Sequence, residues 1–357
     1  MKVLIIIILC ILSFSSCIKN DNDNNIYFTR SDFPIKKELK SGEIIELQDA
    51  LNPKYCYLIR DSLFLISNRD DVNNSYGGLY SLKTGKLIRE IAPKGQGPKE
   101  FINCTLDVRS GDSDIFYLED VIQNKYWICS IDSIINGSDY LLRSFTYSRD
   151  VIRLCPIENE YVGYNFWYLD NDEINNKVNP ISKYTMANTP KGRLGTGHEY
   201  FVANVTGGYV FTNKKNDRYL TANFFTDKIE FYNDSLKLIK RMIGPDYIKP
   251  KYKKIVRDGT NYVFFEKGTS YRAYLAYAIT DKHIYLVYEG TNGTPYKTSN
   301  LKNVEIFKID WDGNLLCNYI LDKHVFSISV DAKEEYIYAC CYDSYDGEIE
   351  LLKYSMQ

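Results

Sequence analysis

The sequence has few of the residues that mark several common functions. It carries 44 basic and 46 acidic residues, for a formal net charge of −2, so it lacks the basic excess typical of nucleic-acid-binding proteins. Its three histidines, His198, His283 and His324, lie far apart, and no C-x-x-C pair occurs. A metal site rich in histidine or cysteine is therefore not expected. A single catalytic histidine stays open, although no Ser-His-Asp order is recognisable.

Patterns that favour helices are also scarce. The chain has only 4 Met and few alanine-rich stretches, whereas it has 32 Tyr and 17 Phe. Aromatic residues favour β-strands. Its 357 residues are many for one ordinary domain, but closed all-β folds often reach this size as a single domain. We therefore expect an all-β protein.

The first residues have the pattern of a secretory signal. Met1 and Lys2 precede an apolar run from Val3 to Leu12, which is too short for a transmembrane helix of about 20 apolar residues. Residues 14–17 then read F-S-S-C. Small residues before a cysteine resemble the lipobox of bacterial lipoproteins, with phenylalanine in place of the more usual leucine. The resemblance implies cleavage of residues 1–16 and lipid on Cys17; an ordinary signal with an incidental cysteine is the alternative.

Residues 17–42 are expected to form a flexible tether. The stretch from Ile18 to Asn25 is rich in Asp and Asn and has no apolar pattern that could pack. An acidic stretch behind a lipidated cysteine resembles the surface-export signal of some Gram-negative outer-membrane lipoproteins, and a plain spacer on the periplasmic face is the alternative. In either case we expect anchoring in the outer membrane through Cys17, because several acyl chains on one cysteine anchor stably.

Seven cysteines remain besides Cys10 and Cys17. An odd number cannot all pair within one chain, and most of the seven lie in apolar alternating stretches. We expect free buried thiols that pack as small hydrophobic side chains, with one disulfide left open. The seven are Cys56, Cys104, Cys129, Cys155, Cys317, Cys340 and Cys341.

An internal repeat indicates the fold. A unit of strand, turn, second strand and a Gly/Asp/Asn turn into a third strand recurs six times, at spacings near or above the roughly 40–50 residues of a propeller blade. We therefore predict an all-β, six-bladed β-propeller with four-stranded antiparallel blades over residues 43–357; an open solenoid and a β-sandwich are the alternatives. The second strands are predicted at 63–66, 115–118, 161–164, 219–222, 284–287 and 336–339, and the third strands at 79–82, 126–129, 181–184, 229–232, 304–307 and 349–352.

The last repeat is incomplete. The chain stops soon after the third strand of the sixth unit, whereas a spare apolar strand, Glu43–Leu47, precedes the first unit. We predict that this N-terminal strand completes the last blade and closes the ring, which leaves no long exposed sheet edge.

One blade junction carries a recognisable motif, G-x-G-P-x-E-F, formed by Gly95, Gly97, Pro98, Glu100 and Phe101. It resembles the junction of NHL-like and TolB-like propellers, and is closer still to the six-bladed β-propeller lipoproteins of unknown function from gut Gram-negative bacteria. The resemblance implies the fold and an envelope location but no activity. We expect the glycines to permit a sharp turn and Glu100 to accept backbone hydrogen bonds that fix it. A phosphate-binding loop is disfavoured because proline removes a donor and strands follow.

Three segments are too long for plain hairpins: 165–179, 243–272 and 289–303. Long loops in compact domains are often functional, and propellers bind ligands at one end of the central channel. Aromatic side chains in these loops suit stacking on sugar rings, with packing inside the loop as the alternative for each. The candidate ligand-binding residues are Trp167, Tyr168, Tyr247, Tyr252 and Tyr296.

Other candidate sites are weaker. Asp170, Asp172 and Glu173 leave a calcium ion or hydrolytic carboxylates open, but no glycine or closing glutamate follows at the required place. No metal or cofactor is therefore predicted, and catalytic residues are unknown. Asp-Ser-apolar triplets resemble the O-glycosylation acceptor of some exported bacterial proteins, with ordinary turns as the alternative. The serines of these triplets are Ser62, Ser133 and Ser235.

These features favour a non-enzymatic binding or scaffold propeller in the cell envelope. Such a protein would hold a glycan, peptide or protein partner at the channel mouth, at the cell surface or on the periplasmic face. The alternative is a propeller enzyme, such as a lactonase, lyase or glycoside hydrolase, that uses carboxylates at the channel mouth with or without a metal. No nucleic-acid partner is expected.

Overall fold

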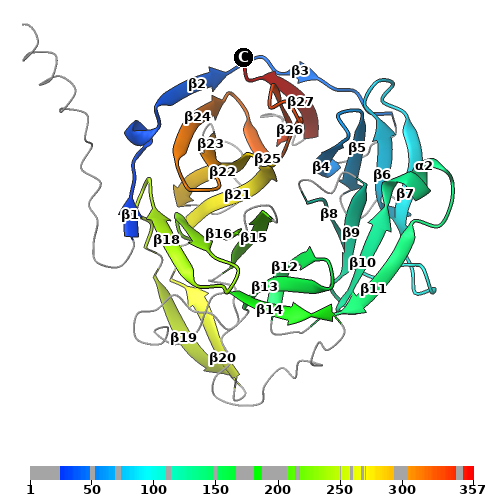
Figure 1. Cartoon of the computed structure of the whole chain (residues 1–357), viewed down its shortest axis with the longest axis horizontal. Helices are drawn as coiled ribbons and strands as arrows, with labels where there is room; N and C mark the ends of the chain where they lie inside the picture. The colour runs from blue at the N-terminus through cyan, green and yellow to red at the C-terminus, as the bar shows by residue number, and fades with distance from the viewer. Residues whose placement is uncertain are drawn as a thin grey trace, which may run out of the picture.

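The structure is a computed structural model of the chain (Figure 1). It describes residues 25–48, 53–68, 74–109, 114–147, 151–165, 181–186, 207–213, 218–249, 251–257, 260–266, 269, 271–292, 304–342 and 349–357.

The described strands form seven sheets, and six of them, each built on consecutive antiparallel strands, are arranged as a ring, which is the architecture of a six-bladed β-propeller (Figure 1). Blade 1 contains β4 (Pro53–Ile59), β5 (Leu63–Asn68), β6 (Ser75–Ser81) and β7 (Leu87–Pro93); blade 2 contains β8 (Cys104–Asp107), β9 (Ile115–Asp120), β10 (Lys125–Ser130) and β11 (Leu141–Thr146). Blade 3 contains, within the described residues, β12 (Val151–Ile157), β13 (Glu160–Asn165) and β14 (Ile181–Thr185).

The second half of the ring follows the same order. Blade 4 contains β15 (Gly208–Asn213), β16 (Arg218–Asn223), β17 (Lys228–Tyr232) and β18 (Leu238–Ile243); blade 5 contains β21 (Tyr271–Ile279), β22 (His283–Asn292), β23 (Glu305–Asp310) and β24 (Leu315–Leu321). Blade 6 contains β25 (His324–Val330), β26 (Tyr336–Tyr342) and β27 (Ile349–Ser355). Each of the predicted second and third strands overlaps an observed strand, so the prediction of a six-bladed propeller is confirmed.

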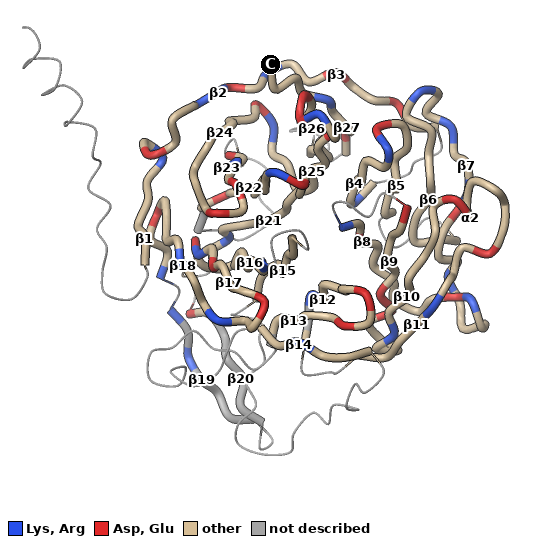
Figure 2. Tube along the Cα trace, in the orientation of Figure 1, with Lys and Arg blue, Asp and Glu red and all other residues tan. Residues whose placement is uncertain are grey.

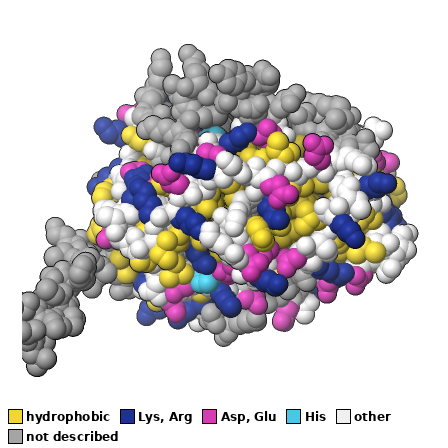
Figure 3. Space-filling view, turned by 90° about the horizontal axis from the view of Figure 1, so that it is seen from above, with side chains coloured by type: hydrophobic (Ala, Val, Ile, Leu, Met, Phe, Trp, Pro, Cys, Tyr) yellow, Lys and Arg dark blue, Asp and Glu magenta, His cyan; other side chains and the backbone are white. Residues whose placement is uncertain are grey.

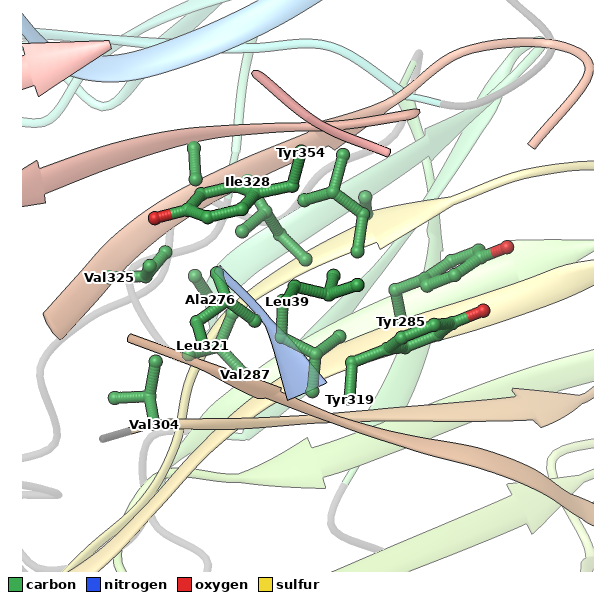
Figure 4. Packing of buried hydrophobic residues seen from close by; sticks show 14 of the residues in the cluster. Leu39, Ala276, Tyr285, Val287, Val304, Tyr319, Leu321, Val325, Ile328 and Tyr354 are labelled. Carbon is green, nitrogen blue, oxygen red and sulfur yellow. The ribbon is translucent and has the colours of Figure 1, made fainter. Parts of the chain in front are cut away.

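The hydrophobic core is divided among the interfaces between blades. Within the described residues it forms six clusters, and each cluster joins one pair of adjacent blades, including the pair formed by blades 6 and 1. Figure 4 shows the cluster between blades 5 and 6, which contains Tyr285 and Val287 of blade 5 together with Val325 and Ile328 of blade 6. Because both faces of a blade are covered, a middle strand such as β26 is buried continuously from Ile337 to Cys341 instead of on alternate residues.

The N-terminal strand closes the ring as the sequence predicts. β3 (Glu43–Ile44) pairs antiparallel with β27 as the fourth strand of blade 6, with Ile44 opposite Leu352. The N–H of Ile45 extends this pairing by donating a hydrogen bond to the carbonyl of Leu351 at 2.8 Å. Sequence-distant ends of the chain therefore share one sheet (Figure 1).

The N-terminal segment also does more than close the last blade. β1 (Asn25–Tyr27) adds a parallel strand to the outer edge of blade 4 through β18, and β2 (Ile35–Leu39) adds one to blade 5 through β24. Between them lies a short 3₁₀ turn, Arg30–Asp32. The segment thus runs along the outer rim of three blades in succession (Figure 1).

The expectation of a flexible tether over residues 17–42 is therefore wrong for residues 25–42. Phe28, Phe33 and Leu39 are only 2%, 5% and 3% exposed, and each belongs to a core cluster between two blades. Burial of these side chains, together with the strand pairing, stabilises the segment on the rim. Residues 17–24 lie outside the described part of the chain.

The predicted long loop 243–272 contains a hairpin of its own. β19 (Tyr252–Arg257) pairs antiparallel with β20 (Thr260–Phe265), and in Figure 1 the hairpin extends outward below blade 4. The other two predicted long loops lie almost entirely outside the described structure. Only residue 165, at the end of β13, and residues 289–292, at the end of β22, are described.

Charges of both signs are interspersed over the described surface. Figure 2 shows Lys and Arg alternating with Asp and Glu around the ring, and the face in Figure 3 has no region dominated by one sign. This distribution agrees with the net charge of −2. A local excess of basic side chains is found inside the ring, along the central channel.

Candidate functional site

The central channel is bordered by the first strand of each blade: β4, β8, β12, β15, β21 and β25 (Figure 1). Its described residues enclose two chambers, one of about 350 Å³ and one of about 210 Å³. The larger chamber lies at the C-terminal ends of these strands and is lined by aliphatic side chains, such as Ile59 and Val108, and by polar and charged ones, such as Asp61. Residues nearer the N-terminal ends of the strands line the smaller chamber, and Lys54, Arg109 and Arg153 are among them. We call it the cationic chamber.

Arg109 lies between the two chambers and lines both. Its guanidinium donates hydrogen bonds to the carbonyl of Val210 at 3.0 Å, to the hydroxyl of Tyr277 at 3.1 Å and to the carbonyl of Leu154. It also forms an ion pair with Asp107 at 2.7 Å. One side chain from the end of β8 therefore joins blade 2 to blades 3, 4 and 5 across the channel.

The electrostatics of Arg109 follow from this position. Its side chain is only 10% exposed. Burial is the largest single influence and would lower the pKa of Arg109, but the Asp107 carboxylate and other neighbouring groups, Tyr277 among them, together outweigh it and hold the pKa above its usual value. The Nε atom of Arg109 is buried and has no hydrogen-bond partner. One of the five donors of this guanidinium thus remains available in the channel.

Tyrosines fix the surroundings of Arg109. The hydroxyl of Tyr57 donates to the carbonyl of Leu106 at 2.9 Å, which joins blades 1 and 2. The hydroxyl of Tyr277 donates to Asp107 at 3.2 Å, which joins blades 5 and 2. Burial raises the pKa of both Tyr57 and Tyr277, so both stay neutral donors. The boundary between the chambers is consequently a network of hydrogen-bonded side chains.

The cationic chamber combines charges with aromatic rings. The ammonium of Lys54 lies 5.5 Å from the ring centre of Tyr55, and the guanidinium of Arg153 lies 5.1 Å from that of Phe224. The carboxyl group of Glu119 also lines this chamber, and burial raises its pKa. Aromatic faces with charged donors can hold a small polar ligand by stacking and charge-assisted hydrogen bonds.

A cluster of charged residues around His324, which the sequence did not predict, lies at the N-terminal end of β25. His324 is 5% exposed at its side chain, and its Nε2 lies 3.8 Å from Glu289 Oε1. Glu289 in turn pairs with Arg272 at 3.1 Å. Neither ring nitrogen of His324 has a hydrogen-bond partner. These residues are far apart in the sequence and meet only because blades 5 and 6 are adjacent.

The aromatic residues predicted to bind a ligand fall largely outside the described part. Trp167, Tyr168 and Tyr296 lie outside it, as does the side chain of Tyr252, whose backbone is part of β19. Tyr247 follows β18 on the outer rim, is 42% exposed and has its ring centre 5.9 Å from that of Tyr27. It lines neither chamber.

The G-x-G-P-x-E-F motif forms the tight junction between blades 1 and 2. Glu100 accepts a hydrogen bond from the Gly97 N–H at 2.8 Å, the kind of contact that the sequence predicts. The Gly95 N–H donates to the carbonyl of Phe101 at 3.1 Å. Gly95 has φ +154°, and a Cβ there would lie 1.9 Å from Glu100 Oε2, so only glycine fits. Phe101 is buried between the blades, whereas Pro98 occupies the turn.

The remaining predicted sites are placed as follows. Ser62 and Ser235 lie exposed in turns, whereas Ser133 is half-buried in the short helix α2 (Ile131–Ile135). All seven predicted thiols are buried, and none of them forms a disulfide within the described residues. Within the described residues no cluster of three or more His, Cys, Asp or Glu could hold a metal ion, and no described helix is both long and apolar enough to cross a membrane. Cys17 and the acidic stretch 170–173 lie outside the described part.

The six blades surround one central channel, so the fold is that of a six-bladed β-propeller. The chain belongs to the TolB-like six-bladed propeller family, whose match covers residues 32–333. No curated protein matches it.

Two solved structures from Bacteroides are similar to this chain. A member of the DUF4221 family from Bacteroides vulgatus is 11% identical with a TM-score of 0.50, and the alignment covers 89% of this chain and 97% of that one. A "putative exported protein" from Bacteroides fragilis is 13% identical with a TM-score of 0.48, covering 90% and 99%. At these identities the likeness extends to the fold alone.

Proposed function

We propose that this chain is a non-enzymatic binding propeller of the bacterial cell envelope that holds a ligand in its central channel. The observation that carries the proposal is the cationic chamber, where aromatic rings and polar groups converge above the Arg109 network. Small-molecule sites are typically concave, with a few fixed polar groups among apolar ones. The ligand would be a glycan, a peptide or an exposed segment of a protein partner, any of which can present one small group to the chamber.

The test is a substitution that fills the chamber without touching its charged groups. Thr105 lines the chamber from β8, on the face that alternates with buried Cys104 and Leu106. Thr105→Phe should occupy the space of a ligand and abolish binding to the hits of a glycan and peptide array. Thr84→Phe, in the exposed turn between β6 and β7, is the matched control and should bind normally. Array binding that survives Thr105→Phe in a stably folded variant would refute the channel as the site.

The envelope part of the proposal rests on the sequence at the N-terminus. The chain would be cleaved before Cys17, lipidated there and held at the outer membrane, on the cell surface or the periplasmic face. In a Gram-negative host the wild-type chain should fractionate with membranes and carry a diacylglycerol-sized mass increment, whereas Cys17→Ser should lose both. A soluble wild-type protein of unmodified mass would overturn lipid anchoring. The same mass spectra test glycosylation at Ser62, Ser133 and Ser235.

A propeller enzyme is the second candidate, favoured by one observation. The Glu119 carboxyl group faces the chamber with a pKa raised by burial, as suits a general acid. Array hits that bind should then be converted, and Glu119→Gln should abolish conversion while retaining binding. Hits recovered unchanged by the wild-type protein would leave binding as the function.

A further inference from the structure

The lining of the cationic chamber holds three basic side chains, Lys54, Arg109 and Arg153, but only two carboxyl groups. Lys54 and Arg153 form no ion pair within the described residues; their charged ends lie against the rings of Tyr55, Tyr209 and Phe224 instead. Of the two carboxyl groups in the lining, Asp107 is already engaged by Arg109 and Tyr277. The other, Glu119, lies near Arg153, but burial outweighs that contact and raises the pKa of the Glu119 carboxyl group. The empty part of the chamber therefore presents an excess of positive charge.

A buried donor without a partner points to the same conclusion. Arg109 Nε is buried and makes no hydrogen bond, although the two Nη atoms of the same guanidinium are fully engaged. A buried donor left unsatisfied costs about 1–3 kcal/mol. A ligand acceptor in the chamber would satisfy it, and a charged acceptor would do so most strongly.

The backbone at Arg153 is shaped to present its side chain. Arg153 has φ +56° and lies in a bulge of β12, where the pairing with β13 shifts between Ile152 and Cys155. A left-handed conformation costs a non-glycine residue about 1–2 kcal/mol, and such strain is concentrated at functional sites. Here the bulge removes Arg153 from the regular ladder, and its side chain is exposed to the chamber instead of packed between blades.

We propose that the cationic chamber binds the carboxylate of a small organic acid, such as an acidic sugar or an amino-acid carboxylate, between Lys54, Arg109 Nε and Arg153. This proposal rests on the binding function proposed above and names the chemical class of the ligand. A chamber of about 210 Å³ admits a small group of this kind and not a large ligand. The remainder of the acid would lie against the tyrosines, which already flank the cations.

The experiment compares acids with their closest neutral counterparts by calorimetric titration of the folded domain at low salt. D-glucuronate is paired with D-glucose, and N-acetyl-L-alanine with N-acetyl-L-alaninamide, so the two pairs distinguish a sugar acid from an amino-acid carboxylate. We expect at least one acid to bind about 10-fold or more tightly than its neutral counterpart, and to bind more weakly as salt is added. Equal binding of acid and neutral compound, or no binding of either acid up to about 10 mM, would overturn the proposal.

Two charge-removing variants locate the site. Lys54→Gln and Arg153→Gln should each weaken binding of the acid about 10-fold. Lys353→Gln is the matched control, because Lys353 also lies over a tyrosine ring, that of Tyr336 at 4.2 Å, but on the outer part of blade 6. Unchanged affinity in both chamber variants would refute the site.

The two proposals can fail separately. If a neutral array hit binds and Thr105→Phe abolishes that binding, the channel is a binding site and only the carboxylate assignment is wrong. If the acids bind but Thr105→Phe has no effect on them, the chamber itself is the wrong location, and both proposals fall together.

Discussion

At the scale of single residues, the junction between blades 1 and 2 depends on the absence of one side chain. The carboxylate of Glu100 folds back over Gly95 and accepts a hydrogen bond from Gly97, so it fills the space that any Cβ at Gly95 would need. The following residue, Phe101, is thereby placed in the core next to Trp127, with ring centres 6.3 Å apart. The motif thus has a structural role at the junction of two blades.

Gly95→Ala should destabilise the protein by about 3 kcal/mol, because it combines a steric clash with a backbone conformation that only glycine adopts readily. Gly137→Ala is the control, since Gly137 also has positive φ (+70°) but a Cβ there meets nothing within 4 Å. It should cost only the backbone term of about 1 kcal/mol. Urea unfolding of both variants measures the difference. Equal losses would mean that the Glu100 contact contributes nothing.

At the scale of elements, the strands of each blade were predictable from sequence because their burial is strong and regular. The twelve central strands are apolar runs bounded by turn residues, and this pattern needs no knowledge of distant contacts. β1 and β2 were missed because their runs are short, and only their partners β18 and β24 fix them in place. The pairing of β3 could be predicted because the last blade lacked a fourth strand.

The channel site was harder to predict for a related reason. In β8, Thr105 and Asp107 alternate with buried Cys104 and Leu106, and Arg109 continues the polar face beyond the strand. Such an alternation is typical of a strand with one polar face, but it does not show that the face lines a channel. Apart from Asp107, the partners of Arg109 come from three other blades, so no local pattern contains them. The long loops with aromatic residues carry the stronger signal in the sequence, and the predicted ligand-binding residues therefore lie there.

An ion cluster between blades 5 and 6 gives an element-scale prediction. Glu334 precedes β26 and accepts hydrogen bonds from Tyr285 at 2.9 Å and Lys308 at 2.8 Å, and lies 2.6 Å from Nδ1 of His283. Burial acts to raise the pKa of Glu334, but the hydrogen bonds from Lys308 and its other partners outweigh it and lower the pKa to about 2. The ionised carboxylate therefore ties the turn before β26 to blade 5.

Because the folded-state pKa of Glu334 lies below its ordinary value of 4.5, its contribution is fully present above that pH and is lost as the pH falls toward 2. Glu334→Gln should cost about 2 kcal/mol at pH 7, and the gap between wild type and variant should narrow between pH 5 and pH 3. Glu335→Gln, which removes a neighbouring carboxylate with no described side-chain ion pair, should show no such gap. Denaturant unfolding across this range would contradict the assignment if the Glu334→Gln gap stayed constant.

At the scale of the whole molecule, the ring of blades is closed in two ways. The clusters between blades form an unbroken ring of hydrophobic contacts within the described residues, and the N-terminal segment runs around the rim as a strap across blades 4, 5 and 6 (Figure 1). The strap is joined to the ring by more than backbone pairing. Arg30 forms ion pairs with Asp246 and Glu305, both at 2.6 Å, one beyond the end of blade 4 and one in blade 5.

Removal of the strap should therefore destabilise the entire ring. A chain that begins at Ser41 keeps β3 but lacks β1, β2 and the buried side chains of Phe28, Phe33 and Leu39. At about 1.5–3 kcal/mol for each buried side chain, the loss should reach roughly 6 kcal/mol relative to a chain that begins at Asn25, as measured by urea unfolding. Within the longer chain, Phe33→Ala should cost about 3 kcal/mol, whereas Ile35→Ala, 56% exposed in the same segment, should cost little. Equal stability of the two truncated chains would show that the strap is an attachment to a ring that is already stable, and that β3 alone is enough to close it.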